Sequence, residues 1–285
     1  MTNHYKDILI LGAAGFTGQY LIQYLLQQKA GIHIIAIDQI IPADPIDPSI
    51  TWIKMSQMHD LLPILSTKTP DFIVNLIGLY GTDDYEALYQ ANVETTRILL
   101  ELIKNNAIKT TKILLIGTAA EYGNPISLPI KETDLAFPVN AYGLTKLFQS
   151  QLGQFYFHNY QLPVVIARTF NVFGKGLSPK LSLGSFAAQI EKAQNNGTLY
   201  VGNIDTKRDF LSIKETVAYY WKLLLQGKPG EIYNVCSGQP VTIRTILEKM
   251  IQDSNKKLTI QTDPKRIKAF DVQEIYGSTG KLKAL

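Results

Sequence analysis

The sequence predicts an α/β protein with a doubly wound parallel sheet and a smaller C-terminal α/β lobe. Short apolar runs alternate with amphipathic stretches up to about residue 174, and parallel strands joined by helices produce this alternation. A glycine-rich turn follows the first apolar run, and the regular alternation stops after residue 174. We therefore expect a first domain over residues 1–174 and a smaller lobe over residues 175–285, with strands allowed to cross between them.

The composition limits the classes of function. The chain has 285 residues, of which 46% are hydrophobic and 18% charged, as is ordinary for a globular protein with one large domain or two lobes. The net charge is +4 and the arginines are scattered, which does not favour nucleic acid and is compatible with an anionic small ligand. The single cysteine and four histidines without ligand spacing exclude an internal disulfide and predict no metal site.

The sequence contains no predicted membrane span or secretion signal. No apolar run reaches the roughly 18 residues that a membrane span needs, and residues 1–7 lack an apolar signal core. We expect a soluble cytoplasmic protein that binds neither membrane nor nucleic acid.

The first strand is expected at residues 8–11 and an amphipathic helix at residues 17–28, with Gly12, Gly15 and Gly18 between and inside them. A strand, a glycine turn and a helix in this order can hold a diphosphate at the helix N-terminus. The glycines permit a tight turn, close backbone approach and close helix packing. Their spacing is Gly-xx-Gly-xx-Gly and departs from Gly-x-Gly-xx-Gly. A plain strand–helix turn is the alternative.

The second strand, expected at residues 33–37, ends in Asp38, which lies 20 residues after Gly18. A carboxylate at this place accepts hydrogen bonds from both ribose hydroxyls of a dinucleotide. The same carboxylate repels a 2′-phosphate, and no arginine follows it in residues 39–42. We therefore expect NAD(H) to be preferred, with NADP(H) possible. A capping or turn aspartate is the alternative.

The other elements follow from the apolar runs. In the first domain we expect a loop at 39–50, strands at 51–55, 71–76, 112–116 and 163–167, a short helix from residue 59, and helices at 84–106 and 142–159. A loop at residues 118–123 follows the fifth strand, at the sheet edge where such sheets bind ligands. Short helices and strands are then expected at 182–194, 198–201, 213–225, 231–235, 242–252 and 257–261, as parts of the lobe and not of the sheet.

Tyr142 and Lys146 are four residues apart, so a helix places both side chains on one face. A phenol beside a fixed ammonium has its anionic form favoured, so we expect the pKa of Tyr142 to fall from about 10 toward neutral pH. Such a tyrosine can protonate an alkoxide or deprotonate an alcohol. Pairs of this spacing also arise by chance, and an ordinary helix-surface pair is the alternative.

Together these residues resemble the extended short-chain dehydrogenase/reductase family of nucleotide-sugar epimerases, dehydratases and reductases, whose fold is Rossmann-like. Matching motifs lie in the family's order along nearly the whole chain: Gly12-xx-Gly15-xx-Gly18, Asp38, Asn92-Val-xx-Thr96, Thr118 before Tyr122-Gly123, Tyr142-xxx-Lys146, Arg168-Thr-Phe-Asn171-Val-Phe-Gly174, and the runs 202–210 and 231–238. The last two runs and residues 263–272 look closest to the branch of GDP-mannose 4,6-dehydratase and GDP-6-deoxy-4-keto-mannose reductase.

The resemblance implies roles for the matching positions. Tyr142 is the implied acid/base, Lys146 lowers its pKa and binds the nicotinamide ribose, and Thr118 hydrogen-bonds the substrate oxygen at carbon 4. The implied cofactor contacts are Gly12, Gly15, Phe16, Gly18, Asp38, Lys146 and, near adenine, Asp60, although His59 stands at the usual place of that acid. The implied contacts to the sugar-nucleotide diphosphate are Asn171, Arg208 and Arg266.

Arginine suits the diphosphate because its planar fork of donors matches phosphate oxygens. An internal salt bridge with Asp209 is the alternative for Arg208. The resemblance also implies that Asn92 is a helix-bulge residue that orders the site, with a purely structural role as the alternative.

The chain departs from the family in two places. Bulky Leu76 and Ile77 stand in the turn after the fourth strand, where small residues are usual, and are expected to reshape the nicotinamide pocket. Related chains usually continue beyond the segment corresponding to residues 280–285, so the lobe is expected to be trimmed or completed by a partner.

Two alanines narrow the type of reaction. Sugar dehydratases that resemble this chain carry acidic residues after the catalytic Thr, whereas Ala119 and Ala120 follow Thr118 here. A methyl group transfers no proton, and Glu121 is expected to point away from Ala120 if the loop is extended.

We therefore expect a reductase of a nucleoside-diphosphate 4-keto-6-deoxy sugar, active in deoxysugar biosynthesis as a homodimer, with Tyr142 as the proton donor. A nucleotide-sugar epimerase with tightly bound NAD is the nearest alternative, and a non-catalytic dinucleotide-sensing protein is the alternative of another class.

Overall fold

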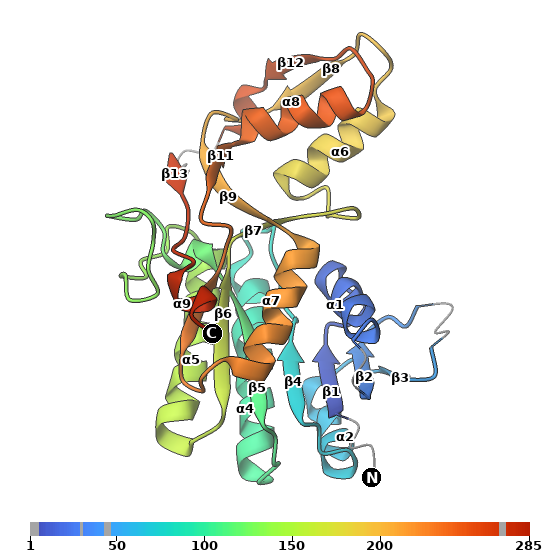
Figure 1. The fold of residues 1–285 in the computed structure, drawn as a ribbon, viewed down its shortest axis with the longest axis vertical. Coiled ribbons are helices and arrows are strands. Elements are labelled where there is room, and N and C mark those ends of the chain that lie inside the picture. The colour runs from blue at the N-terminus through green and yellow to red at the C-terminus, as the bar shows by residue number, and fades with distance from the viewer. Residues whose placement is uncertain (1–5, 29–30, 43–46, 268–271) are drawn as a thin grey trace.

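A seven-stranded sheet forms the centre of the computed structural model, which describes residues 6–28, 31–42, 47–267 and 272–285 (Figure 1). Neighbouring strands pair in parallel throughout this sheet. In sheet order the strands are β10 (Ile232–Val235), β6 (Val164–Thr169), β5 (Lys112–Thr118), β4 (Phe72–Asn75), β1 (Lys6–Leu11), β2 (Ile32–Asp38) and β3 (Ile50–Lys54). The doubly wound sheet predicted from the sequence is confirmed, and its direction of winding reverses between β1 and β4.

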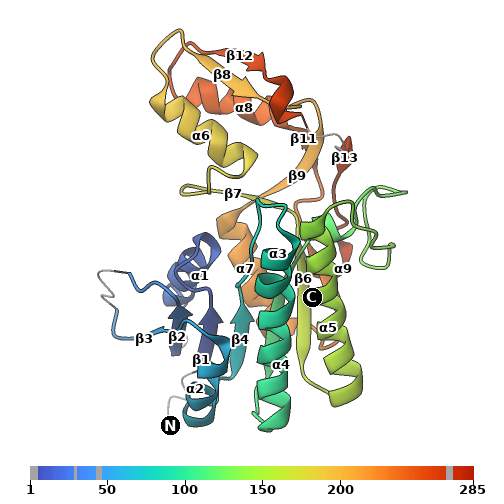
Figure 2. The ribbon, with the colours of Figure 1, turned by 180° about the vertical axis from the view of Figure 1, so that it is seen from behind.

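Helices cover both faces of the sheet, because successive side chains of each strand point to opposite faces. Ile8 and Ile10 pack against helices α1 (Phe16–Leu26) and α7 (Ile213–Gln226), which lie in front of the sheet in Figure 1. Leu9 and Leu11 join the opposite core, against the helices seen in front in Figure 2: α2 (Leu61–Thr67), α4 (Thr95–Asn105) and α5 (Ala141–Tyr160). With both faces buried, ligands have access at the strand ends.

The helix predicted over residues 84–106 is confirmed, and the bulge expected at Asn92 lies within it. It divides into α3 (Tyr85–Tyr89), a π-helical segment (Gln90–Glu94) and α4. The side chain of Asn92 in the π-helical segment accepts a hydrogen bond from the Leu79 backbone N–H at 2.8 Å and donates to the Leu79 carbonyl at 3.1 Å and to Thr145 Oγ1 at 3.0 Å. These three bonds stabilise the π-helical turn, which contains one residue more than an α-helical turn.

The smaller lobe sits above the carboxyl ends of the strands (Figure 1). Its core lies among Leu183, Phe186, Leu199, Val201 and Leu247. Its elements are β7 (Asn171–Phe173), α6 (Ser182–Lys192), β8 (Thr198–Val201), β9 (Lys207–Ser212), β11 (Pro240–Thr242), α8 (Ile243–Asp253), β12 (Thr259–Thr262) and β13 (Glu274–Ile275).

Two segments that were expected in the lobe belong to the first domain instead. Strand β10 joins the sheet by pairing with β6, with Ile232 opposite Ile166. Helix α7 covers the sheet and buries Val217 and Leu224 in the core that it shares with α1. The short helix α9 (Gly280–Lys283) packs against β10, and Lys281 Nζ donates to the Glu231 carboxylate and the Ile232 carbonyl, each at 2.6 Å. Among the residues that the structure describes, no helix is long and apolar enough to cross a membrane.

Candidate active site

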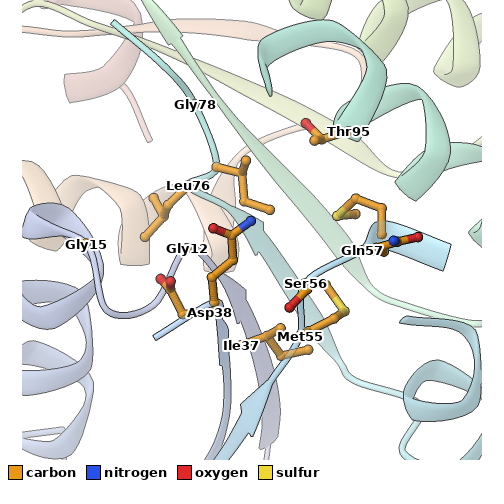
Figure 3. Close-up of a pocket in the computed structure, with 13 residues that line it drawn as sticks. Gly12, Gly15, Ile37, Asp38, Met55, Ser56, Gln57, Leu76, Gly78 and Thr95 are labelled. Carbon is orange, nitrogen blue, oxygen red and sulfur yellow. The ribbon is translucent and has the colours of Figure 1, made fainter. Parts of the chain in front are cut away.

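The candidate active site is a cleft at the carboxyl edge of the sheet, made of two adjoining hollows that share Gly12, Gly15, Leu76 and Gly78. The larger, of about 590 Å³, lies between the sheet and the lobe and is lined by residues of both. The smaller, of about 320 Å³, lies over the end of β2 (Figure 3). Such an edge, where the winding of the sheet reverses, is the usual ligand site of this architecture.

The glycine turn is shaped by close backbone approach. Gly12 has φ +76°, and a Cβ there would lie 3.1 Å from the backbone of Leu76 and Ile77. A Cβ on Gly18 would lie 2.4 Å from the Ala13 carbonyl oxygen, so α1 can pack on the turn only through glycine. Helix α1 begins after Gly15, with no acidic residue in its first turn. Its positive end therefore fits the diphosphate of a dinucleotide, as the sequence predicts.

Asp38 both supports this turn and lines the smaller hollow. Its carboxylate accepts hydrogen bonds from the Ala14 N–H at 2.9 Å and the Ile40 N–H at 3.3 Å. Figure 3 shows it beside the glycine turn. Carboxylate oxygens accept more than one hydrogen bond each, so the turn role and the predicted ribose contact are compatible.

The structure does not bring Asp60 to the cleft. Asp60 is exposed at the N-terminus of α2, and among the described residues that line the smaller hollow its segment is represented by Met55, Ser56, Gln57 and Met58 instead. The polar side chains of this segment that line the smaller hollow are Ser56 and Gln57. The chain turns into a 3₁₀ segment at Met58, which carries Asp60 past the hollow.

Tyr142 and Thr118 are brought together where α5 begins. The Asn140 side chain accepts a hydrogen bond from the Gly143 N–H at 2.8 Å, and a Cβ on Gly143 would lie 2.5 Å from the Ala120 carbonyl oxygen. The first turn of α5 therefore packs directly on the loop after β5, and the Tyr142 and Thr118 side chains both line the larger hollow. Burial raises the pKa of Tyr142 to about 12, although the neighbouring Thr118 hydroxyl opposes this rise. At neutral pH the phenol therefore holds its proton.

Lys146 is buried one helical turn after Tyr142, and its ammonium donates to Gln149 Oε1 at 2.6 Å. Gln149 in turn donates to the Ile116 carbonyl at 3.1 Å. Burial lowers the pKa of Lys146 to about 8. The expectation that Lys146 lowers the pKa of Tyr142 is wrong for this structure. Burial disfavours the charged phenolate and raises the pKa, and the Lys146 ammonium is directed to Gln149.

This burial predicts a pH-dependent difference in stability between the wild type and Lys146→Met. Unfolded lysine binds a proton up to pH 10.5 and folded Lys146 only up to about pH 8, so the unfolded state holds more protons between these values. Stability of the wild type relative to the variant should then rise by about 2.5 kcal/mol from pH 7 to pH 10. Urea unfolding of both proteins at the two pH values measures the difference, and a constant difference would contradict the burial of a charged Lys146.

The predicted diphosphate contacts divide between the cleft and the lobe surface. Asn171 and Arg208 line the larger hollow, where Asn171 joins β7 to β9 by donating to the Asp209 carbonyl at 3.1 Å. Arg266 is not among the described residues that line either hollow. Its guanidinium donates to the Tyr200 carbonyl at 2.8 Å and lies 3.5 Å from the Asp263 carboxylate, so this exposed arginine holds the lobe together. Residues 268–271 of the matching run lie outside the described residues.

Several site residues escaped the sequence analysis. Gln149 lies three residues after Lys146, a helical spacing that could have revealed it. Tyr220 lines the larger hollow from α7 and shares a hydrogen bond of 2.7 Å with Thr169, but no local pattern marks this residue. Among the described residues, no three His, Cys, Asp or Glu side chains gather as a metal site would require.

The chain is similar to known proteins over nearly its whole length. The model of the NAD dependent epimerase/dehydratase family matches residues 8–236. GDP-6-deoxy-D-mannose reductase of Pseudomonas aeruginosa is 29% identical over 286 residues, which cover 97% of this chain and 90% of that protein. dTDP-6-deoxy-L-talose 4-dehydrogenase (NAD(P)(+)) of Kitasatospora kifunensis is 28% identical, with 90% of this chain and 82% of that protein covered.

Solved structures extend the similarity to the whole fold. RMD from Pseudomonas aeruginosa, complexed with NADPH, superposes with a TM-score of 0.84 at 27% identity, over 98% of this chain and 91% of that one. UDP-glucuronic acid 4-epimerase from Bacillus cereus, in complex with UDP-glucuronic acid and NAD, also gives a TM-score of 0.84, at 25% identity over 98% of this chain and 92% of that one.

Proposed function

The chain belongs to the NAD dependent epimerase/dehydratase family, and we propose that within it the protein is an NAD(P)H-dependent reductase of a nucleoside-diphosphate 4-keto-6-deoxy sugar. The relatives described above include a reductase and a 4-dehydrogenase of 6-deoxy sugars, which supports chemistry at one carbon of such a sugar. The strongest support for this reaction is the absence of an available acid or base in the loop after β5, where Ala119 and Ala120 line the cleft and Glu121 is buried.

A 4,6-dehydratase must remove water across carbons 5 and 6, which requires a base at one carbon and an acid at the other. Ala119 and Ala120, which line the cleft directly after Thr118, offer only methyl groups. Glu121, the next acid, is fully buried, and its oxygens accept hydrogen bonds from the Thr118 N–H, Ser150 Oγ and Arg168 Nε. Neither alanine nor this engaged carboxylate supplies the elimination chemistry, which favours a reaction at carbon 4 alone.

The side chains that remain suit a reduction. The nicotinamide cofactor, when bound, supplies the hydride for carbon 4. Tyr142 holds its proton at neutral pH because its pKa is about 12, and a protonated phenol is the form that a reductase needs as acid. Thr118 lines the same hollow as Tyr142, while Asn171 and Arg208 line the part of the cleft proposed for the diphosphate.

We expect the enzyme to bind NADH at least about tenfold more tightly than NADPH, because the Asp38 carboxylate repels a 2′-phosphate beside it. Fluorescence titration with each cofactor measures the two affinities. Asp38→Asn keeps the hydrogen bond from the Ala14 N–H and removes the negative charge. The variant should therefore discriminate less between NADH and NADPH than the wild type. Equal affinities in the wild-type protein would contradict this role for Asp38.

The proposed reaction is tested by mixing the protein with NADH and a nucleoside-diphosphate 4-keto-6-deoxy hexose. We expect one NADH to be oxidised for each 4-hydroxy product, followed by absorbance and by identification of the sugar. Interconversion of 4-epimers without net loss of NADH would identify an epimerase instead. Tight cofactor binding with no turnover of any nucleotide sugar would favour a sensing protein.

A further inference from the structure

Glu121, in the 3₁₀ turn that follows β5, is a fully buried charge next to the residues that line the cleft. A buried carboxylate is costly unless donors surround it, and three donors from three elements do so here. The Thr118 N–H at the end of β5 donates at 2.8 Å to Oε1. Ser150 Oγ on α5 and Arg168 Nε on β6 donate to Oε2 at 2.8 and 2.7 Å.

The surrounding chain makes room for this carboxylate. A Cβ on Gly117 would lie 2.4 Å from Glu121 Oε1 and 3.3 Å from Ser150 Oγ, so only glycine fits beneath it. The guanidinium of Arg168 stacks on the Tyr122 ring at 4.7 Å, and the Tyr122 hydroxyl donates to Asn234 Oδ1 on β10 at 2.7 Å. The ion pair of Glu121 and Arg168 is therefore held at the carboxylate by the Thr118 and Ser150 donors and at the guanidinium by the Tyr122 ring.

Glu121 lies at the junction of the two elements that carry the reacting side chains. Thr118 and Glu121 form a capping box at the start of this turn. The Glu121 carboxylate accepts a hydrogen bond from the Thr118 N–H, and the Thr118 hydroxyl accepts one from a backbone N–H of the turn. Ser150 lies four residues after Lys146 on the same face of α5. The carboxylate thus joins the turn that presents Thr118 to the helix that presents Tyr142 and Lys146.

We propose that Glu121 is a positioning residue of the active site, which fixes the Thr118 turn against α5 so that Thr118, Tyr142 and Lys146 keep their mutual geometry. The residue does not touch the substrate, and its role in turnover rests on the function proposed above. A second consequence is electrostatic, because the negative charge of Glu121 raises the pKa of both Lys146 and Tyr142.

Other titratable groups also act on this cluster, from each element packed around it. Tyr80 in the loop after β4 and Tyr220 on α7 interact electrostatically with Tyr142. Arg168 on β6 and Tyr122 in the turn interact with Glu121 or with each other. Glu121 is the carboxylate that acts on both Tyr142 and Lys146, so its substitution has a specific expected signature.

The test compares Glu121→Gln, which keeps the shape and removes the charge, with Glu121→Asp, which keeps the charge and withdraws it from the Thr118 N–H. The pKa of Lys146 is measured in the cofactor-free protein by NMR titration of ¹³C-labelled lysine across pH, with Lys146→Met to assign the signal. We expect Glu121→Gln to lower it by about one unit and Glu121→Asp to leave it near the wild-type value. The matched control is Glu101→Gln on α4, whose carboxylate is bonded to Lys104 and Tyr156 outside the cleft, and it should leave the pKa unchanged.

Turnover adds a second readout. Both Glu121 variants should lower kcat about tenfold with KM for NADH nearly unchanged, since a displaced catalytic group slows the reaction without removing cofactor contacts. If Glu121→Gln fails to fold, Glu121→Asp alone decides, and a wild-type kcat in that variant overturns the proposal. If Glu121→Gln lowered the melting temperature but left the Lys146 pKa and kcat unchanged, Glu121 would only stabilise the fold, and the proposal would be refuted. Absence of sugar turnover in the wild-type protein would refute the proposed function and leave the Lys146 measurement valid.

Discussion

Replacing Tyr142 with Phe is expected to lower kcat by about a hundredfold to ten-thousandfold, the usual scale for loss of a general acid. The variant keeps the aromatic ring at the start of α5 and loses the hydroxyl that lines the larger hollow beside Thr118. Cofactor affinity should stay nearly unchanged, because the glycine turn and Asp38 are untouched. Steady-state kinetics with a 4-keto sugar and a fluorescence titration with NADH measure the two effects separately.

Tyr156→Phe is the matched control for this prediction. Tyr156 lies on the same helix, but its hydroxyl bonds to Glu101 on α4, away from the cleft. We expect this variant to lose some stability and to retain its kcat. If Tyr142→Phe kept most of the wild-type kcat, Tyr142 would not be the acid.

Gly18→Ala is expected to have the largest effect on cofactor binding. The added methyl group would lie 2.4 Å from the Ala13 carbonyl oxygen and 2.6 Å from the Gly12 carbonyl oxygen, both backbone atoms of the turn. Helix α1 must then move away from the turn, which costs about 1–3 kcal/mol of stability. It also withdraws the helix N-terminus from the diphosphate, so NADH affinity should fall at least about tenfold.

Gly280→Ala provides the control for Gly18→Ala. Gly280 begins α9, and the nearest atom to an added Cβ is Ser278 Oγ at 3.6 Å, an ordinary contact. Urea unfolding and NADH titration of the two variants should therefore separate a general effect of the substitution from the specific clash. A Gly18→Ala protein with wild-type stability and NADH affinity would show that the turn tolerates displacement.

Local patterns predicted the sheet and the centre of the site because their signals are short in sequence. The apolar run at β1, the glycine turn and Asp38 lie within one βα unit and the strand that follows, and the structure joins them as expected. Tyr142 and Thr118 come from neighbouring segments, and the resemblance to a known family predicted that they meet.

Long-range contacts decided what the sequence could not predict. Strand β10 is buried along all four residues, and only its pairing with β6 assigns it to the sheet. The resemblance predicted a helix bulge at Asn92, but the bonds that hold this π-helical turn reach Leu79 and Thr145, which are distant in sequence. The pKa of Tyr142 rises because of burial, which helical spacing does not reveal. Glu121 was expected to point away from Ala120 in an extended loop, but the loop is a 3₁₀ turn, and the pairing of Glu121 with Arg168 depends on the neighbouring strand β6.

The most direct test of the proposed reaction follows the transferred hydrogen. The protein is incubated with NADH deuterated at carbon 4 of the nicotinamide and a nucleoside-diphosphate 4-keto-6-deoxy hexose, and the sugar is analysed by NMR and mass spectrometry. The account predicts one deuterium at carbon 4 of a 4-hydroxy product for each NAD⁺ released. An unlabelled product, loss of water from a nucleotide hexose, or interconversion of 4-epimers without net oxidation of NADH would contradict it.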